Sequence, residues 1–278
     1  MKFNIIADSS CDLSDKMKKN MNVEIVPLTL RLEDREYVDD ESLNVREYVK
    51  DMGECKTSPK TSCPSPMDFI KKYSKEGSSF VVTLSSKLSA TYQSAVTAKN
   101  MFLEENSQKF IHVFDSLSAS AGETVICRKI YELAQNGAGD LEIVEKVSKY
   151  ISEMKTLFLL ESLEHLAKAG RLNTIVAKVA SVLDIKPIMG STEEGNIKLV
   201  EKIRGYKRAF NRFIEVIGEE CADTSDKILG ISYCNCLDRA ILLKEEILKR
   251  YKFKEIILSE MAGLSSTYSD DGGLVIAF

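Results

Sequence analysis

The stretch that decides the fold is SFVVTLSSKLSATYQSA, which runs from Ser79 to Ala95. Its first six residues are apolar, β-branched or small and follow Gly77, a pattern typical of a buried strand. From Ala90 to Glu105 the apolar residues recur at helical spacing, and Ser89 stands where an N-cap belongs. A strand, a polar turn and a helix in this order place Ser89 at the carboxyl edge of a sheet, where open α/β folds bind ligands.

The same alternation of strand and helix runs through the N-terminal half. The sequence predicts strands over 3–7, 79–84 and 110–114, and helices near 45–52, 89–105, 120–135 and 141–154. Residues 23–40 are expected to form a small hairpin excursion around a Glu33-Asp34 turn. Alternation at this spacing indicates a largely parallel, Rossmann-like sheet joined by crossover helices.

The regular alternation of strand and helix ends at about residue 160. Strands are predicted over 156–160, 185–189, 197–203, 228–233, 255–259 and 274–278, and helices over 162–169, 174–183, 205–220 and 237–250. Gly170 suits the end of one helix, Asn173 can cap the next, and residues 193–196 read as a hairpin turn. We therefore expect two α/β domains, 1–160 with a parallel sheet flanked by helices and 161–278 with a mixed sheet and helices, with a ligand between them.

Composition excludes several classes of protein. The chain has 278 residues, 44% of them hydrophobic and 29% charged, which is long enough and apolar enough for substantial cores. Its 38 basic and 42 acidic residues give no electrostatic footprint for nucleic acid. No apolar run approaches the roughly 20 residues that span a bilayer, so no stable membrane insertion is expected. Seven cysteines without framework spacing indicate reduced thiols and a cytoplasmic location.

A second polar stretch, TSPKTSCPSP, runs from Thr57 to Pro66. Its five hydroxyls and three prolines make it stiff, rich in donors, and unfit to be a helix or a central strand. It ends in a helix start, with Ser65 as N-cap, Pro66 in the first position and Asp68 in the third. Such a loop can hold an anion, because its donors and the helix dipole point the same way. The alternative is an ordinary surface loop.

Other chemistries find little support in the residues. Cys234-Asn235-Cys236 lacks a second cysteine pair at metal-ligand spacing, so we expect no metal, and no motif predicts a cofactor. Ser86 or Ser89 as a nucleophile would need a base, but His112 falls in a strand and His165 on a helix, and no Gly-x-Ser-x-Gly elbow is present. We therefore expect a binding protein without catalysis of its own.

The motifs carry a family resemblance. Thr61-Ser62-Cys63-Pro64-Ser65 resembles the Thr-Ser-x-Pro-Ser motif of the DegV family of bacterial fatty-acid-binding proteins, and residues 85–95 are similar to its Ser-Ser-x-Leu-Ser-Gly-Thr-Tyr-Gln-Ser-Ala. Further matches lie at 7–13, 114–116, 163–172, and 186–188 with 194–197. Six matches in order over nearly the whole chain identify it as a member of this family.

The resemblance implies a lipid carrier whose Thr61 and Ser89 hydroxyls hold the carboxylate of a long-chain fatty acid. Ser62 and Ala90 flank these positions, and Ala90 replaces the glycine of the family motif. Head-group hydroxyls and the amides of the helix start can satisfy a carboxylate without a fixed cation. The tail would lie in an apolar tunnel.

The clearest departure from the family lies near the C-terminus, where Tyr268 stands in place of the usual histidine. The resemblance implies that the carrier presents its fatty acid to a separate ATP-dependent fatty acid kinase. A phenol donates a hydrogen bond but carries no positive charge near neutral pH, so this departure bears on the hand-off more than on binding. Arg171, which matches the family's Gly-Arg, and Arg204 are the basic positions expected to meet a partner or ligand carboxylate.

Two other classes of function stay open at this point. One is an enzyme, either a serine hydrolase or a small-molecule phosphotransferase. The other is a DegV-like interaction module that has lost the kinase hand-off, which the altered segment at residues 268–273 allows.

Overall fold

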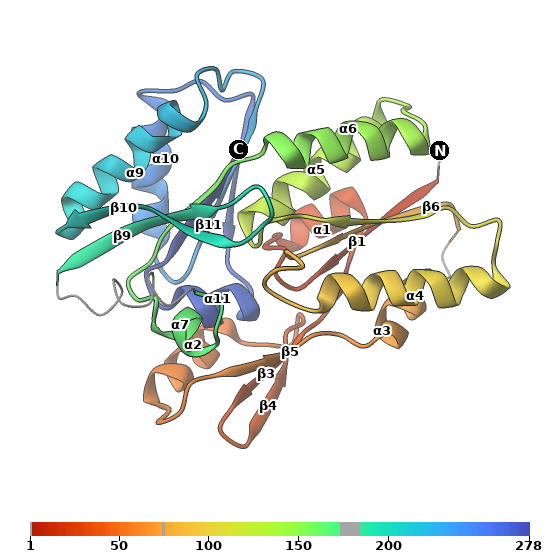
Figure 1. The fold of residues 1–278 in the computed structure, drawn as a ribbon, viewed down its shortest axis with the longest axis horizontal. Coiled ribbons are helices and arrows are strands. Elements are labelled where there is room, and N and C mark those ends of the chain that lie inside the picture. Colours follow the sequence, from red (N-terminus) through yellow and green to blue (C-terminus); the bar gives the residue numbers. More distant parts are fainter. Residues whose placement is uncertain (1, 74–75, 173–183) are drawn as a thin grey trace.

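The computed structural model describes residues 2–73, 76–172 and 184–278, and within them the chain builds three sheets. The helix expected over 174–183, with its cap at Asn173, lies outside the described residues. Figure 1 shows a parallel sheet, a larger mixed sheet and a small sheet below them.

The first sheet is parallel throughout and has the order β2-β1-β6-β7. Its strands are β1 (Phe3–Asp8), β2 (Val23–Val26), β6 (Ser78–Thr83) and β7 (Ile111–Asp115). Helices α3 (Pro66–Tyr73) and α4 (Thr91–Glu105) cover one face, whereas α5 (Ala121–Gln135) and α6 (Asp140–Glu153) lie on the other, with α1 (Asp15–Met21) beside β2 (Figure 1). Burial on both faces explains why the strands read as continuous apolar runs. The predicted Rossmann-like sheet is confirmed.

The second sheet is mixed and has the order β10-β9-β8-β13-β11-β12. Its strands are β8 (Thr156–Leu159), β9 (Ile185–Ser191), β10 (Ile197–Arg204), β11 (Ile228–Tyr233), β12 (Glu255–Glu260) and β13 (Leu274–Ala277). Among these pairings, β11 with β12 is parallel and the others are antiparallel. The expected mixed sheet and the hairpin at 193–196 are therefore confirmed. Because β8 belongs to this sheet, the sheet begins at Thr156, ahead of the division expected near residue 160.

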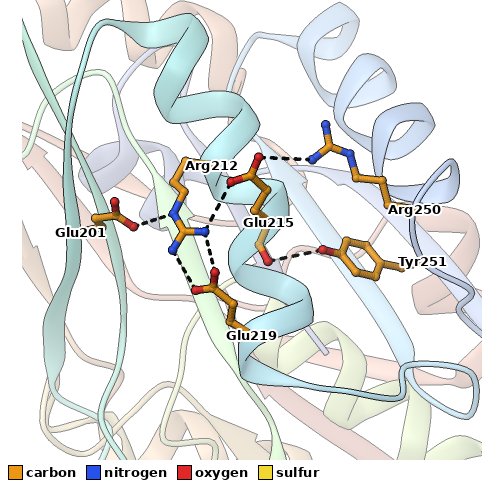
Figure 2. Close-up of polar contacts among 6 residues, drawn as sticks. All are labelled: Glu201, Arg212, Glu215, Glu219, Arg250 and Tyr251. Atoms are coloured by element: carbon orange, nitrogen blue, oxygen red, sulfur yellow. Dashed lines mark hydrogen bonds and ion pairs between the residues drawn. The ribbon is translucent and has the colours of Figure 1, made fainter.

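Two helices cover one face of the mixed sheet, α9 (Tyr206–Glu220) and α10 (Leu237–Leu248). Arg212 of α9 forms an ion-pair network that reaches the neighbouring sheet. Its guanidinium donates to Glu201 on β10 at 2.7 Å and to both oxygens of Glu219 at 2.6 and 2.8 Å, as Figure 2 shows. Because these groups are partly exposed, the network adds little to stability.

Helix α5 forms a layer shared by the two large sheets. It packs against β1 and β6 on one side and against β11 and β13 on the other. Gly230 of β11 permits this approach, because a side chain there would meet Val125 and the carbonyl of Ala121 at under 3 Å. The two α/β units therefore share one core across α5.

The small sheet confirms the hairpin expected around the Glu33-Asp34 turn, but over a shorter span than 23–40. Its order is β4-β3-β5, with β3 (Thr29–Leu32), β4 (Arg35–Val38) and β5 (Lys60–Ser62). Residues 23–26 instead join the parallel sheet as β2, because Pro27 has no N–H to continue the strand and divides the run. The proline-rich stretch contributes β5 as an edge strand, paired through Leu30 and Thr61.

Three more helices belong to the described part of the chain, α2 (Val45–Glu54), α7 (Glu164–Lys168) and α11 (Gly263–Ser269). Helix α11 is absent from the sequence prediction. Asp39 accepts the amides of Gly263 and Leu264 at 2.7 and 2.8 Å, and Asp12 accepts the amide of Ala262 at 2.8 Å. These two buried carboxyl groups satisfy the first free amides of the helix and so fix where it starts.

Replacing Asp39 by Ala is expected to lower the free energy of unfolding by about 3 kcal/mol, because two buried amides lose their acceptor. Asp39→Asn keeps one carbonyl acceptor and should lose less. Urea denaturation measures both, with Asp40→Ala, an exposed neighbour, as the matched control. Equal stability of Asp39→Ala and Asp40→Ala would contradict the role of Asp39.

Candidate ligand-binding site

A cavity lies between the carboxyl ends of the parallel strands, the strands β8 and β9 and the helix α11. It contains about 890 Å³ of space between atoms, a volume that includes space open to solvent. Most of its wall is apolar: Leu28, Leu84, Leu88, Leu117, Phe158, Leu160, Leu166, Ile197, Leu264 and Val275. Such a wall suits a long hydrocarbon chain.

The polar part of the wall includes Thr61, Ser89, Tyr268 and Arg171. Thr61 on β5 and Tyr268 on α11 are joined by a hydrogen bond of 2.8 Å between their hydroxyl oxygens. Either hydroxyl can donate, so the pair can turn one O–H toward a ligand oxygen. The structure thus brings together Thr61, Ser89 and Tyr268, three of the positions predicted from sequence.

Ser89 was predicted to be the N-cap of the helix, but it lies one residue before the observed N-cap. Ala90 is the N-cap of α4, because residues 85–89 form a turn in which the amides of Leu88 and Ser89 both donate to the carbonyl of Ser85. The Ser89 hydroxyl still accepts the amide of Thr91 at 3.3 Å, and it contacts the hydroxyl of Thr91 at 2.9 Å. Ser89 therefore stays at the start of α4 and lines the cavity.

Arg171 brings a fixed cation to the cavity, which the sequence reasoning did not require. Gly170, with φ of +74°, ends α7 in a left-handed turn, and the amide of Arg171 donates to the carbonyl of Leu166 at 2.9 Å. The side chain donates to the carbonyls of Leu88 at 3.1 Å and Ala169 at 2.7 Å. Its guanidinium carbon lies 6.0 Å from the ring centre of Tyr268, so the charge sits beside the phenol.

Three other predicted residues lie elsewhere. Ser62 and Ala90 are exposed, and neither is among the described residues that line the cavity. Ser62 follows Thr61 on β5, so its side chain points to the opposite face of the strand. Arg204 ends β10, is exposed, and pairs with Asp184 at 3.1 Å, away from the cavity wall.

A second polar group in the wall was missed from sequence. It consists of Ser10, Ser118, Ser120, Thr156 and Ser265. Ser10 follows β1 and the serines at 118 and 120 follow β7, so the rule that selected Ser89 applies equally to them. Ser265 lies on α11, which the sequence did not reveal.

Buried acids lie behind this second group. Burial raises the pKa of Asp8 and of Asp12 to about 7, although both accept hydrogen bonds. Asp8 accepts the amides of Ser10 and Leu84, and Asp12 accepts the hydroxyl of Ser120. Near neutral pH both groups are therefore only partly charged, which limits their repulsion of a ligand carboxylate.

Asp270, which follows α11, has a histidine partner near the site. Its carboxylate lies 3.0 Å from Nδ1 of His165 on α7, and this contact raises the pKa of His165. The same nitrogen lies 3.1 Å from the carbonyl of Thr267. His165 thus ties α7 to α11, beside Tyr268.

The family model for "Uncharacterised protein, DegV family COG1307" matches residues 2–278. The chain belongs to the DegV family. This confirms the assignment made from the motifs. A DegV domain-containing protein of Streptococcus gordonii is 32% identical over 284 residues, covering 100% of this chain and 99% of that protein.

Solved DegV structures are similar over their whole length. A DegV family protein from Ruminococcus gnavus, described with vaccenic acid, has a TM-score of 0.94 at 38% identity and 99% coverage of both chains. The Streptococcus pneumoniae Fatty Acid Kinase (Fak) B3 protein loaded with linoleic acid has a TM-score of 0.91 at 29% identity, covering 100% of this chain and 99% of that one. A protein from Eubacterium eligens loaded with heptadecanoic acid gives 0.92 at 26% identity, with 99% coverage of both. The mixed α/β fold is therefore that of DegV proteins.

The described residues show two further features that bear on function. None of their helices has the length and hydropathy to cross a bilayer. They also hold no group of three or more His, Cys, Asp or Glu arranged to bind a metal ion.

The raised pKa values predict an unusual pH dependence of stability. Because the folded pKa of Asp8 and of Asp12 exceeds the unfolded one, the fold binds more protons between about pH 4 and pH 7. Their stabilising contribution is full below about pH 4 and is lost as the pH rises through about 7. Asp8→Asn should therefore reduce the fall in unfolding free energy between pH 5 and pH 8 by about 2 kcal/mol.

Urea denaturation at the two pH values measures this difference. Asp34→Asn, at a fully exposed position, serves as the control and should leave the fall unchanged. A fall in Asp8→Asn equal to that of the parent would show that Asp8 does not titrate near neutral pH.

Proposed function

We propose that this chain is a carrier that binds one long-chain fatty acid in the cavity. The observation that carries the proposal is the hydrogen bond between Thr61 and Tyr268, placed with Ser89 and Arg171 in the wall of an otherwise apolar cavity. Hydroxyls beside one fixed guanidinium match the needs of a single carboxylate. The DegV proteins described with vaccenic, linoleic and heptadecanoic acids support the same class of ligand.

The two ends of the ligand contribute differently to binding. Burying a tail of about sixteen carbons at about 0.8 kcal/mol per methylene is worth about 12 kcal/mol before entropy losses. Each head-group hydrogen bond adds about 1 kcal/mol, and one to a charged group about 1.5–3 kcal/mol. The tail therefore supplies most of the affinity, while the head group fixes the orientation of the carboxylate.

The carrier presents this carboxylate to a separate ATP-dependent fatty acid kinase and performs no phosphoryl transfer itself. The name of the Streptococcus pneumoniae Fak B3 protein supports a link between this fold and such a kinase. Tyr268, Arg171 and the pair of His165 with Asp270 surround the head-group end. A cytoplasmic location fits the seven cysteines, all of which are free thiols.

The two α/β units correspond to a division near residue 160 with the ligand between them. The cavity wall supports this, because it combines residues of the parallel unit, such as Leu84 and Leu117, with residues of the mixed sheet, such as Phe158 and Gly190.

In the double variant Thr61→Ala with Ser89→Ala, the affinity for palmitic acid is expected to fall about ten-fold or more. The affinity for hexadecanol should fall less than three-fold, because only the acid needs the carboxylate contacts. Displacement of a fluorescent fatty acid measures both ligands. Ser62→Ala is the matched control, since Ser62 is the exposed neighbour of Thr61 on the same strand. Equal losses for acid and alcohol would remove Thr61 and Ser89 from the head-group role.

A further inference from the structure

Ser120 has a strained backbone in the wall of the cavity. It stands directly before α5, after the turn that leaves β7, with φ of 60° and ψ of −122°. Residues other than glycine rarely adopt this conformation, and where they do so the strain commonly serves a function. Neither the fatty-acid tail nor the head-group contacts require it.

The local sequence resembles a nucleophile elbow, although residues 116–119 separate the end of β7 from Ser120. In hydrolases with this device, a serine on a sharp strand-to-helix turn lies between two glycines, two residues away on each side. Here Gly122 occupies the second glycine position, and a side chain there would collide with the hydroxyl of Ser118. Ser118 itself stands at the first glycine position, which is why the literal motif is absent from the sequence.

A base is in place beside the serine. The hydroxyl of Ser120 donates to Oδ2 of Asp12 at 2.5 Å, and Oδ1 of the same carboxyl accepts the amide of Ala262 at 2.8 Å. Asp12 is fully buried and held in one orientation. Its pKa near 7 suits a group that must take up and return a proton at neutral pH.

Stabilisation for a developing negative charge is also present. Ala121 is the first residue of α5, a helix of 15 residues, and its amide finds no acceptor within the described part of the chain. In a nucleophile elbow the amide directly after the serine is one donor of the oxyanion hole. The dipole of α5 adds to its effect.

We propose that Ser120 is an acyl-accepting nucleophile, with Asp12 as its base, acting on long-chain acyl esters or thioesters held in the cavity. The proposal rests on the proposed function in one respect, since the same cavity must take the acyl chain. It goes beyond carriage, and it departs from the expectation that the chain has no catalysis of its own.

The reaction balances with water as the second substrate. The Ser120 oxygen bonds to the acyl carbon, its proton passes to Asp12, and the bond to the alcohol or thiol breaks as that group takes the proton. Water then attacks the acyl carbon, giving a proton through Asp12 to the departing Ser120 oxygen. The products are the free fatty acid and the alcohol or thiol, so the carrier would load itself from an activated acyl group.

The test combines a hexadecyl fluorophosphonate probe with p-nitrophenyl palmitate. Peptide mapping by mass spectrometry should place the probe on Ser120, and the ester should release p-nitrophenol. Ser120→Ala and Ser120→Gly should abolish both reactions. Asp12→Asn should slow them about 100-fold or more, the range expected for loss of a general base. Glycine tolerates the backbone conformation, so Ser120→Gly keeps the test valid if the alanine variant fails to fold.

Ser86→Ala is the control, because Ser86 is exposed and does not line the cavity. Its labelling and ester hydrolysis should match the parent. Absence of label, or label on any residue other than Ser120, would overturn the proposal. Palmitate binding measured in the same samples keeps the two ideas apart, since intact binding without labelling contradicts the nucleophile and leaves the carrier standing.

Discussion

The anchoring of α11 is the constraint on which the site depends. Asp39, from the segment after β4, and Asp12, from the loop after β1, together accept the first amides of this helix. The hydroxyl of Tyr48 on α2 holds its last turn through Thr267 at 2.7 Å. Since α11 carries Tyr268, these contacts bring a residue near the C-terminus to Thr61 and Arg171. Three segments distant in sequence thereby meet at one end of the cavity.

The shared layer of α5 explains why a cavity exists at all. The helix packs against both sheets and so separates the parallel sheet from the mixed one. Beyond its N-terminus, short loops and hydroxyl side chains line part of the cavity. Ser118 and Ser120 line that space together with Thr156, the first residue of β8. A cavity walled by rigid elements loses little entropy on binding, which favours a carrier that holds its ligand tightly. The strain at Ser120 sits where these elements converge.

Much of this architecture could be predicted from sequence, because strands such as 79–84 and 228–233 and helices such as 205–220 carry strong periodicity and clear boundaries. The ordered motifs gave the family, and with it Thr61 and Ser89. What escaped prediction depends on tertiary contacts. Helix α11 has seven residues, most of them with small or hydroxyl side chains, and it starts where Asp39 and Asp12 accept its first amides. Strand β5 forms because β3 has an open edge with which it can pair. Strand β2 ends at Val26, before Pro27, and pairs with β1 in the parallel sheet. Arg171 was selected from sequence as a basic candidate. Its position beside Tyr268 depends on the direction of the turn at Gly170, which the sequence alone does not predict.

The central claim is that the cavity holds one long-chain fatty acid by its carboxylate. Denaturing extraction of the purified protein, followed by mass spectrometry of the released lipid, tests it most directly. The account predicts about one fatty acid of long chain length per protein chain, either retained from the cell or taken up when fatty acid is added. Extracts without stoichiometric lipid, from a protein that also fails to bind added fatty acids, would contradict it.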